Sequence, residues 1–332
     1  MRFAFIVDPL DRIKTYKDSS FAMMQEAATR GHQIYSIQQE GIVLTGGDVI
    51  GYAQLLGLTG DSADWYRAAS AQAAPLHSFD AVLMRKDPPF DMEYVYSTYL
   101  LELAEAHGAL VFNRPRAVRD YNEKLSVAKF PQFTVAMLVS RDESLIRAFL
   151  AEHGDVILKP LDAMGGSSIF RVRPDDPNLS VIIETMTQLG RRTIMAQRYI
   201  AEIAEGDKRI LLIDGKPAPY SLARIPKAGE TRGNLAAGGT GMAQPLSQRD
   251  RDIAEGIGPT LAENGLLFVG IDVIGDYLTE INVTSPTCMQ EIRELSGFNS
   301  AAMMIDALEA KVVARIEQGR GAETSARFGE PL

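Results

Sequence analysis

The feature that most constrains this chain is a stretch in its last quarter, residues 268–287, where polar side chains interrupt two apolar runs. Phe268–Ile274 and Leu278–Val283 are rich in β-forming residues, and Gly275-Asp276 separates them. Two such runs around a short glycine-containing turn are typical of a β-hairpin. We therefore expect a largely buried hairpin here.

Three oxygen-bearing side chains, Asp272, Glu280 and Asn282, stand inside these runs. Glu280 and Asn282 are two residues apart, so a strand points both to one face. Asp272 joins them only if the connecting loop has an odd number of residues. Buried carboxylates are costly unless paired or bound to a cation, and three oxygen ligands suit Mg²⁺. The alternative is a strand pair with solvent-facing acids, but the hydroxyl-rich loop ending at Thr287 favours a ligand site.

Composition excludes several classes of protein. The 332 residues, 46% hydrophobic and 23% charged, fit a globular chain of two or three domains. With a net charge of −9 and no long basic run, nucleic acid is not an expected partner. The single cysteine, Cys288, excludes disulfides within the chain and is expected to be a small buried thiol. The apolar start is too short for a signal peptide and no run of 18 apolar residues occurs, so we expect a cytoplasmic protein without membrane contact.

The N-terminal third has the pattern of a parallel α/β sheet. Arg2–Val7 reads as a strand, a basic loop follows, Asp18 can cap a helix, and Gln33–Ile37 is the next strand. Ligands gather at the carboxyl ends of such strands, which makes Lys17 a candidate, although a solvated lysine is the commoner alternative.

Farther along, residues 41–76 read as irregular apart from a possible hairpin at Gly46-Gly47. Arg85 ends a buried strand before two prolines, where its planar fork could clamp a carboxylate. An ion pair with Asp87 or Asp91 is the alternative. Asp91 is expected to cap a helix to residue 107, and the first domain to end near residue 122.

The middle of the chain carries a glycine pair between two strands. A helix is expected to open at residues 122–124, and Asp155–Pro160 and Ile169–Arg173 read as strands. Between them, Gly165–Ser168 offers backbone N–H groups and hydroxyls that could cradle phosphate; a flexible turn is the alternative. No Walker A motif occurs in the sequence.

The last part contains a long glycine-rich segment. Strands are expected at 193–200, 208–213 and 218–224, with helices at 247–264 and 300–316 and a polar tail at 318–332. Residues 225–241 hold glycines 229, 233, 238, 239 and 241 and few apolar side chains. Long loops of this kind are commonly functional lids.

These pieces, in this order, resemble the ATP-grasp fold preceded by an N-terminal parallel α/β domain. Four motifs resemble bacterial glutathione synthetase over about residues 2–315: Met-Arg-Lys-Asp-Pro-Pro-Phe at 84–90, Ile-Leu-Lys-Pro-Leu-Asp-Ala-Met-Gly-Gly at 157–166, Glu-Thr-Arg-Gly-Asn-Leu-Ala-Ala-Gly-Gly at 230–239 and Thr-Glu-Ile-Asn-Val-Thr-Ser-Pro-Thr at 279–287. The resemblance implies a substrate domain at 1–122, a small ATP-grasp subdomain at 123–200, a C-terminal subdomain at 201–316 and a flexible tail at 317–332.

The resemblance also implies roles for individual residues. The nucleotide would be held by Lys124, Lys159, Gly165, Gly166, Ser167, Ser168, Gln197, Tyr199, Ile200 and Asp207, and Mg²⁺ or Mn²⁺ by Asp272, Glu280 and Asn282. Arg209, Arg224 and Lys159 would act on the transferring phosphoryl group. The substrate would contact Lys17, Arg85, Arg232 in the lid, Asn282, Ser285, Thr287 and Glu291.

The implied activity is the ATP-dependent joining of γ-glutamylcysteine to glycine through an acyl phosphate, by a homotetramer. Because an acyl phosphate hydrolyses in water, a closing lid is a mechanistic need that residues 225–241 could meet. Two alternatives are another ATP-grasp ligase with a different carboxylate and amine, and a non-enzymatic ATP-grasp binding protein similar to synapsin.

Overall fold

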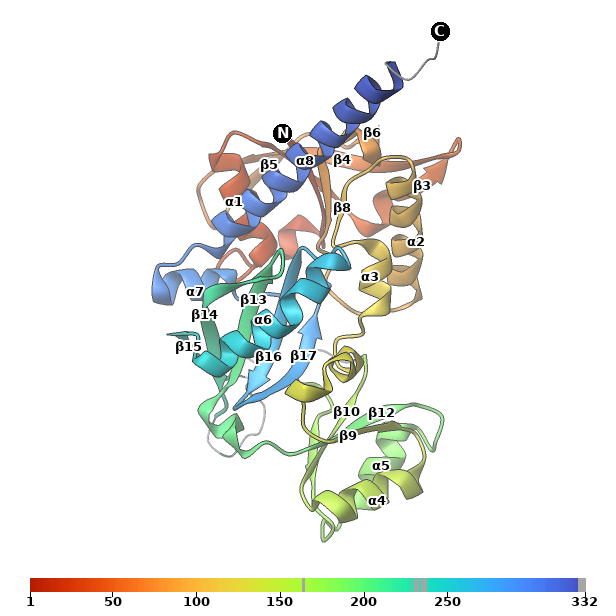
Figure 1. Ribbon diagram of the computed structural model, residues 1–332, viewed down its shortest axis with the longest axis vertical. Helices are drawn as coiled ribbons and strands as arrows, with labels where there is room; N and C mark the ends of the chain where they lie inside the picture. The colour runs from red at the N-terminus through yellow and green to blue at the C-terminus, as the bar shows by residue number, and fades with distance from the viewer. Residues whose placement is uncertain (163–164, 228, 230–232, 234–237, 328–332) are drawn as a thin grey trace.

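The computed structural model describes residues 1–162, 165–227, 229, 233 and 238–327, and side chains as far as residue 318. Figure 1 shows three parts: an N-terminal domain, a small subdomain at the opposite end of the molecule, and a sheet with its helices between them. The fold is mixed α/β, as the sequence predicted.

The N-terminal domain is built on a sheet of order β3-β4-β2-β1-β7-β8. Strands β1, β2, β7 and β8 run parallel, and β4 adds to β2 in the antiparallel sense. Asp18 caps α1 and Asp91 caps α2, as predicted. The bounds are β1 Arg2–Ile6, α1 Ser19–Thr29, β2 Gln33–Ile37, β7 Ala81–Met84, α2 Met92–Ala106, β8 Val111–Phe112 and α3 Pro115–Asp120.

The prediction that residues 41–76 are irregular is wrong. Strands β3 (Ile42–Thr45) and β4 (Asp48–Leu58) form the hairpin at Gly46-Gly47, and β5 (Tyr66–Ala68) and β6 (Gln72–Pro75) both pair with β4. β4 alternates buried and exposed residues along part of its length, as expected of a strand with one solvated face. These strands extend the parallel sheet at its β2 edge in the antiparallel sense.

The small subdomain is an antiparallel sheet of order β11-β10-β12-β9 with two helices on it. The helix expected to open at residues 122–124 is only a 3-10 helix, Leu125–Lys129. The elements that follow are β9 Met137–Ser140, α4 Glu143–His153, β10 Val156–Pro160, β11 Phe170–Val172, α5 Leu179–Thr187 and β12 Ile194–Arg198.

The large subdomain has the order β15-β14-β13-β16-β17, antiparallel throughout. Its bounds are β13 Asp207–Ile213, β14 Lys216–Ile225, β15 Thr240–Pro245, α6 Gln248–Glu263, β16 Phe268–Ile274 and β17 Tyr277–Asn282. The central hairpin predicted from residues 268–283 is therefore present. Ser247 caps α6 in a capping box with Asp250.

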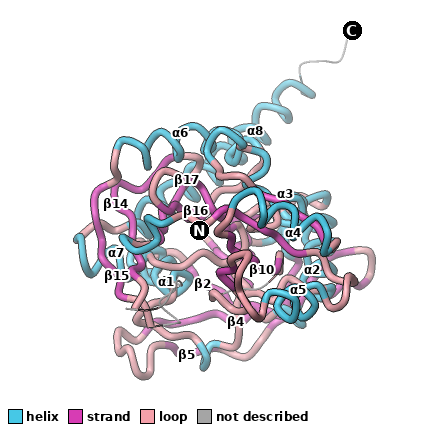
Figure 2. Tube along the Cα trace, turned by 90° about the horizontal axis from the view of Figure 1, so that it is seen from below, coloured by secondary structure: helices cyan, strands magenta, loops and turns pink. Residues whose placement is uncertain are grey.

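Two helices close the chain, α7 (Met289–Ser296) and α8 (Ser300–Arg327). α8 packs on α1 and continues past residue 316, where the sequence predicted its end. Figures 1 and 2 both show its last turns projecting away from the body. None of the described helices combines the length and apolar composition that a bilayer crossing requires.

Buried side chains show which parts pack together. The two larger cores each mix residues of the N-terminal sheet with residues of the large subdomain: Ile6 and Ile210 belong to one, Phe5 and Leu211 to the other. The small subdomain has a separate core, which includes Leu158 and Ile183. The first and last parts thus form one packed body, to which the small subdomain is attached.

Candidate active site

Two cavities, of about 140 and 410 Å³, lie where the three parts meet. They share four lining residues, Glu123, Gly165, Arg209 and Asn282, so they adjoin. A molecule in one cavity can therefore reach a molecule in the other. The first cavity lies between β10, β12 and the β16–β17 hairpin, and the second reaches the basic loop after β1.

The first cavity gathers most of the residues predicted to hold a nucleotide. Ser167 and Ser168 continue the Gly165-Gly166 turn but line neither cavity. Gln197, Tyr199 and Ile200 come from β12 and the chain just after it. The predicted residues that line it are Lys124, Lys159, Gly165, Gly166, Gln197, Tyr199, Ile200, Asp207, Arg209, Asp272, Glu280 and Asn282.

The second cavity gathers most of the residues predicted to hold a substrate. They come from the loop before α1, from β13, β14 and β17, from the loop that leads into α7, and from the first turn of α7. Arg232 lies outside the described residues, as does most of the 230–237 part of the predicted lid. The predicted residues that line it are Lys17, Arg209, Arg224, Asn282, Ser285, Thr287 and Glu291.

The predicted metal ligands share one face of the hairpin. Asp272 pairs directly with Glu280 in the ladder, and Asn282 pairs with Gly270. The loop holds only Gly275-Asp276, an even number. A register shift between Asp272 and Val273 supplies the missing residue, because Thr279 has no partner in the ladder. A β-bulge therefore does what an odd loop was expected to do.

This set of donors fits a hard cation. Two carboxylates and one amide are oxygen ligands of the kind Mg²⁺ prefers. The amide nitrogen of Asn282 donates to the Gly270 carbonyl at 3.3 Å, which leaves its side-chain oxygen available. Within the described residues, no group of three His, Cys, Asp or Glu side chains forms a metal site by itself. The metal prediction thus depends on Asn282.

Asp272 is also the centre of a buried ion network. Arg209 donates to both of its oxygens, the Nη2 bond measuring 2.9 Å, and Arg224 Nη2 lies 2.8 Å from Oδ2. Burial alone would raise the pKa of Asp272, but the two guanidinium groups outweigh it and hold that pKa well below its usual value. The two arginines therefore hold Asp272 as a carboxylate.

Arg224 also pairs with Asp207. Burial raises the pKa of Asp207 to about 7, against the attraction of Arg224. Asp207 and Asp272 thus share the guanidinium of Arg224. Of the two carboxylates, Asp272 is the one whose charged form the arginines stabilise more. Both arginines stay charged. Arg209 lines both cavities, and Arg224 lines the second.

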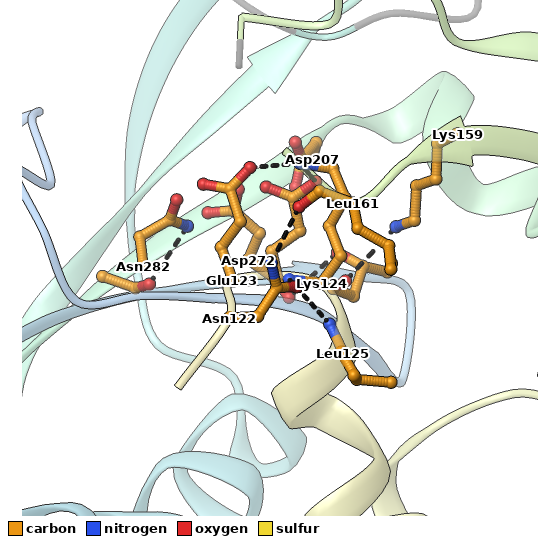
Figure 3. Close-up of polar contacts among 12 residues, drawn as sticks. Asn122, Glu123, Lys124, Leu125, Lys159, Leu161, Asp207, Asp272 and Asn282 are labelled. Atoms are coloured by element: carbon orange, nitrogen blue, oxygen red, sulfur yellow. Dashed lines mark hydrogen bonds and ion pairs between the residues drawn. The ribbon is translucent and has the colours of Figure 1, made fainter. Parts of the chain in front are cut away.

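Glu123 was not singled out from the sequence, yet it lines both cavities. Its carboxylate pairs with Lys124 (Figure 3). The Lys124 ammonium also lies 3.6 Å from Glu280. Burial, together with Glu280, raises the pKa of Glu123 to about 7 despite Lys124. The only sequence signal was its place beside a predicted phosphate-binding lysine.

Lys159 enters the group from β10, on the side opposite Asn282 in Figure 3. It is buried, and its Nζ donates to the Thr279 carbonyl at 3.4 Å. Burial lowers its pKa, although Glu280 opposes the shift. A buried ammonium with one long hydrogen bond is well prepared to bind an anion.

Three buried polar atoms of the described residues have no hydrogen-bond partner and belong to side chains that line the cavities. They are Gln197 Nε2 and Asp207 Oδ1 in the first cavity and Glu291 Oε2 in the second. Buried polar groups are normally satisfied. These atoms are therefore one donor and two acceptors available to ligands.

Arg85 is buried, but it does not line the second cavity. Its Nε donates to Ser20 Oγ at 3.1 Å, and its two terminal nitrogens donate to the carbonyls of Thr284 at 3.3 Å and Pro286 at 2.9 Å. Neither Asp87 nor Asp91 forms an ion pair with this guanidinium. Arg85 fixes the backbone of the loop that carries Ser285 and Thr287. Its role as a carboxylate clamp stays a prediction.

Cys288 also lies beside the second cavity and is buried, as expected for a small core thiol. Burial raises its pKa, although Arg209 and Arg224 oppose the shift. Its backbone is left-handed, with φ of 92°, where it begins α7. A protonated thiol in this position is a poor nucleophile.

Two family models together match most of this chain. The model of the prokaryotic glutathione synthetase N-terminal domain matches residues 1–119, and that of the prokaryotic glutathione synthetase ATP-grasp domain matches residues 123–297. The chain belongs to the prokaryotic glutathione synthetase family. It is therefore related to ATP-dependent ligases. The prediction from the sequence that this chain has an ATP-grasp domain is confirmed.

Curated members of the family are similar along nearly the whole chain. The glutathione synthetase of Ralstonia nicotianae is 62% identical over 93% of this chain and 95% of its own length. That of Nitrosomonas europaea is 61% identical over 94% and 98%. Among solved structures, D-cycloserine synthetase DcsG has a TM-score of 0.67 at 14% identity, covering 94% of this chain and all of its own, which shows the fold alone.

Proposed function

We propose that this protein joins γ-glutamylcysteine to glycine in an ATP-dependent reaction that yields glutathione, ADP and phosphate. Membership of the glutathione synthetase family supports the reaction class. The observation that carries it in the structure is the junction of two cavities at Arg209 and Asn282. One cavity offers the groups that a nucleotide needs, and the other offers the mixed charges that a dipeptide needs.

The first cavity would take ATP. Lys124 and Lys159 would hold its phosphates beneath the Gly165–Ser168 flap. The backbone of residues 197–200 would bind the adenine edge, while Gln197 Nε2 and Asp207 Oδ1, both without partners, are available to base and ribose. Asp272, Glu280 and Asn282 would hold Mg²⁺ or Mn²⁺, which would neutralise charge on the phosphates.

The second cavity would take the dipeptide. Glu291 has an acceptor without a partner, which suits the ammonium of the γ-glutamyl group. Lys17 suits a carboxylate, and Ser285 and Thr287 offer hydroxyls beside it. Arg232, in the predicted lid, is the remaining residue predicted to contact the substrate.

The two cavities together account for the steps that amide synthesis requires. A carboxylate is a poor electrophile, so the cysteinyl carboxylate first attacks the γ-phosphorus of ATP, giving an acyl phosphate and ADP. Arg209 and Arg224 lie where charge develops and would stabilise it. The glycine amine then attacks the acyl carbon, the C–O bond to phosphate breaks, and the amine loses a proton. Closure over residues 225–241 would exclude water from the acyl phosphate.

By family resemblance we also propose a cytoplasmic homotetramer and the division at residues 122 and 200. The two alternative functions predict different results. Another ligase of this fold would use a different carboxylate or amine, and a binding protein would not turn over ATP.

The test is ADP release with Mg²⁺-ATP, leaving out one substrate at a time. We expect turnover only when both γ-glutamylcysteine and glycine are present. Glu291→Gln should raise KM for the dipeptide about tenfold with KM for ATP unchanged, since it removes one charged contact to the dipeptide. Binding of ATP without stimulation by either compound would leave the fold assignment standing and overturn the substrates.

A further inference from the structure

An arginine of the small subdomain stacks on a tyrosine of the first cavity. The guanidinium carbon of Arg171, on β11, lies 3.6 Å from the centre of the Tyr199 ring. A cation this close to an aromatic face is attracted to the ring. Tyr199 lines the first cavity, whereas Arg171 lines neither cavity of the candidate site. Contact between Arg171 and a molecule in the first cavity therefore passes through Tyr199.

Asp155 holds the guanidinium over the ring. Arg171 Nε donates to Asp155 Oδ1 at 2.8 Å, and Arg171 Nη2 donates to Asp155 Oδ2 at 2.6 Å. This bidentate geometry fixes the plane of the guanidinium. The hydrogen bonds from Arg171 are the main reason that the pKa of Asp155 lies below its usual value. The backbone N–H of Tyr199 donates to the Asp155 carbonyl at 2.9 Å, which extends the β10–β12 ladder by one pair and joins Asp155 to both partners.

The register of the small sheet places Arg171 on the face toward the first cavity. Arg171 pairs with Ile157 from one side, and Gln197 pairs with Ile157 from the other. Directly opposed residues of antiparallel strands project to the same face, and Ile157 and Gln197 both line the first cavity. Their neighbours Val156 and Val172 belong to the core of the small subdomain, on the opposite face. The side chain of Arg171 therefore lies on the cavity face of the sheet.

The position of this group along the sheet corresponds to one end of the first cavity. Asp155, Ile157 and Lys159 are two residues apart, so they share one face. A strand rises about 3.3 Å per residue, which separates Asp155 from Lys159 by roughly 13 Å. With the phosphates at Lys159, as in the proposed function on which this inference rests, the base of the nucleotide lies toward Asp155 and Tyr199. We propose that Arg171, together with Asp155, is a positioning residue that holds the Tyr199 ring against this base.

Arg173 provides a matched control beside Arg171. Arg173 Nε donates to the same Oδ2 of Asp155 at 3.1 Å, and its side chain is 58% exposed, against 29% for Arg171. Among the described residues, the cation over the Tyr199 ring is that of Arg171. Arg171→Leu and Arg173→Leu therefore each remove one positive charge beside Asp155, but only the first removes the stacked cation.

The test is the affinity of the full-length protein for Mg²⁺-ATP, measured by calorimetry without the other substrates. We expect Arg171→Leu to weaken binding about tenfold and Arg173→Leu to stay within about twofold of wild type. Arg171→Lys, which keeps a cation on this strand, should recover part of the loss. Equal affinities of Arg171→Leu and Arg173→Leu, whether both unchanged or both weakened, overturn the proposal.

Steady-state kinetics separates positioning of the base from a general loss of structure. KM for ATP should rise about tenfold in Arg171→Leu, while kcat and KM for γ-glutamylcysteine keep their wild-type values. Inorganic tripolyphosphate carries phosphates without a base, so its inhibition constant should be the same in Arg171→Leu as in wild type. An inhibition constant that rises along with KM for ATP would place the effect at the phosphates and contradict the proposal.

A double-mutant cycle tests whether Arg171 acts through the ring. Tyr199→Leu should weaken ATP binding, and adding Arg171→Leu to it should weaken binding no further. Additive losses would show that Arg171 acts by a route other than Tyr199.

Failure of this inference can be told from failure of the proposed function. If wild type binds ATP but γ-glutamylcysteine and glycine do not stimulate ADP release, the proposed substrates are wrong, and the comparison of Arg171 with Arg173 still decides this inference. If wild type makes glutathione and the two leucine variants bind ATP equally, only this inference is wrong. A wild type that binds no ATP overturns both.

Discussion

Asp272 holds two buried arginines and also stands where the metal prediction places a ligand. Replacing its carboxylate by an amide, Asp272→Asn, leaves Arg209 without a charged partner in the interior. Removing one partner of a buried ion pair commonly lowers the free energy of unfolding by about 3–5 kcal/mol. Losing an electrostatic contact to the phosphates commonly lowers kcat about 100-fold. We expect both effects, the first measured by urea unfolding and the second by ADP release.

Glu280→Gln is the control for Asp272→Asn. Glu280 stands opposite Asp272 in the ladder but pairs with Lys124 at the longer distance of 3.6 Å. This variant should lose turnover and need more Mg²⁺, with a smaller change in the free energy of unfolding. If both variants lose stability equally, the arginine network does not depend on Asp272 as described.

The half-buried carboxyl of Glu105 on α2 should make the free energy of unfolding depend on pH. Burial raises its pKa to about 7, with Glu102 adding to the shift and Arg114 opposing it. The folded state therefore keeps this proton at a pH where the unfolded chain has lost it. Its contribution to stability is complete below about pH 4.5 and is lost as the pH rises through about 7. Glu105→Gln should remove this loss from the unfolding free energy measured between pH 4.5 and 7.5.

The exposed acid Glu93 on the same helix supplies the matched control. Glu93→Gln should keep the wild-type pH dependence. A Glu105→Gln protein that follows the wild-type curve would show that the carboxyl of Glu105 is not desolvated in solution.

Sequence predicted the residue types of the site better than their contacts. Lys124, Lys159 and Glu291 could be named because the resemblance to a known family carries them, and each lines a cavity. The partners of Arg85 could not, because they are carbonyls about 200 residues away in the chain. Glu123 was missed because an acid next to a lysine on a surface turn carries no signal until the fold buries both.

The Thr279 bulge decides which face of β17 carries the ligands. Thr279 Oγ1 donates to the Asp272 carbonyl at 3.1 Å and holds the bulge. Thr279→Val keeps the extra residue and loses one hydrogen bond, so we expect a cost of about 1 kcal/mol and retained turnover. Deleting Thr279 removes the bulge, and Glu280 then follows Leu278 directly and pairs with Asp272 in a regular ladder, so both stay on one face.

The deletion variant should therefore keep ADP formation, as Thr279→Val does. Both are compared by urea unfolding and by steady-state ADP release. Loss of ADP formation in a deletion variant that still folds would mean that the site depends on the bulge itself and not only on the pairing of Glu280 with Asp272.

The loop at 284–287 depends on Arg85 in the same way. Lysine cannot replace the three donors of a planar guanidinium, so Arg85→Lys should loosen the carbonyls of Thr284 and Pro286. We expect KM for the dipeptide to rise about tenfold while KM for ATP stays unchanged, by analogy with the loss of one charged hydrogen bond. A change in KM for ATP alone would contradict this role.

The strands at 42–75 show why a sheet extension escaped prediction. Gly51 and Gly57 interrupt β4, and glycine usually marks a turn. A Cβ at Gly51 would lie 2.6 Å from Ile37 Cδ1 and 2.8 Å from Leu76 Cδ2, so these two buried side chains would have to shift to accommodate any larger residue. Ile37 and Leu76, which pack around Gly51, are distant from it in sequence, so the sequence near Gly51 carries no sign of this packing. The helix caps at Asp18 and Asp91 depend only on neighbouring residues and were therefore predicted.

At the level of the whole molecule, the cores divide the chain differently from its domains. The N-terminal domain and the large subdomain share two cores, while the small subdomain has its own. The separate subdomain carries Lys159 and the Gly165–Ser168 flap, and the shared body carries Arg209 and Asp272. ATP would bind across this boundary.

Matched core variants test this division. Leu158 and Leu211 are both fully buried, the first in the small subdomain and the second in the shared body. Each change to alanine should cost about 2–5 kcal/mol locally. By hydrogen exchange, Leu158→Ala should lose protection in β9–β12, α4 and α5 only. Leu211→Ala should lose it in both the N-terminal sheet and the large subdomain, because both contribute to its core. Loss of protection in β1 or β13 on Leu158→Ala would show that the small subdomain does not open as an independent unit.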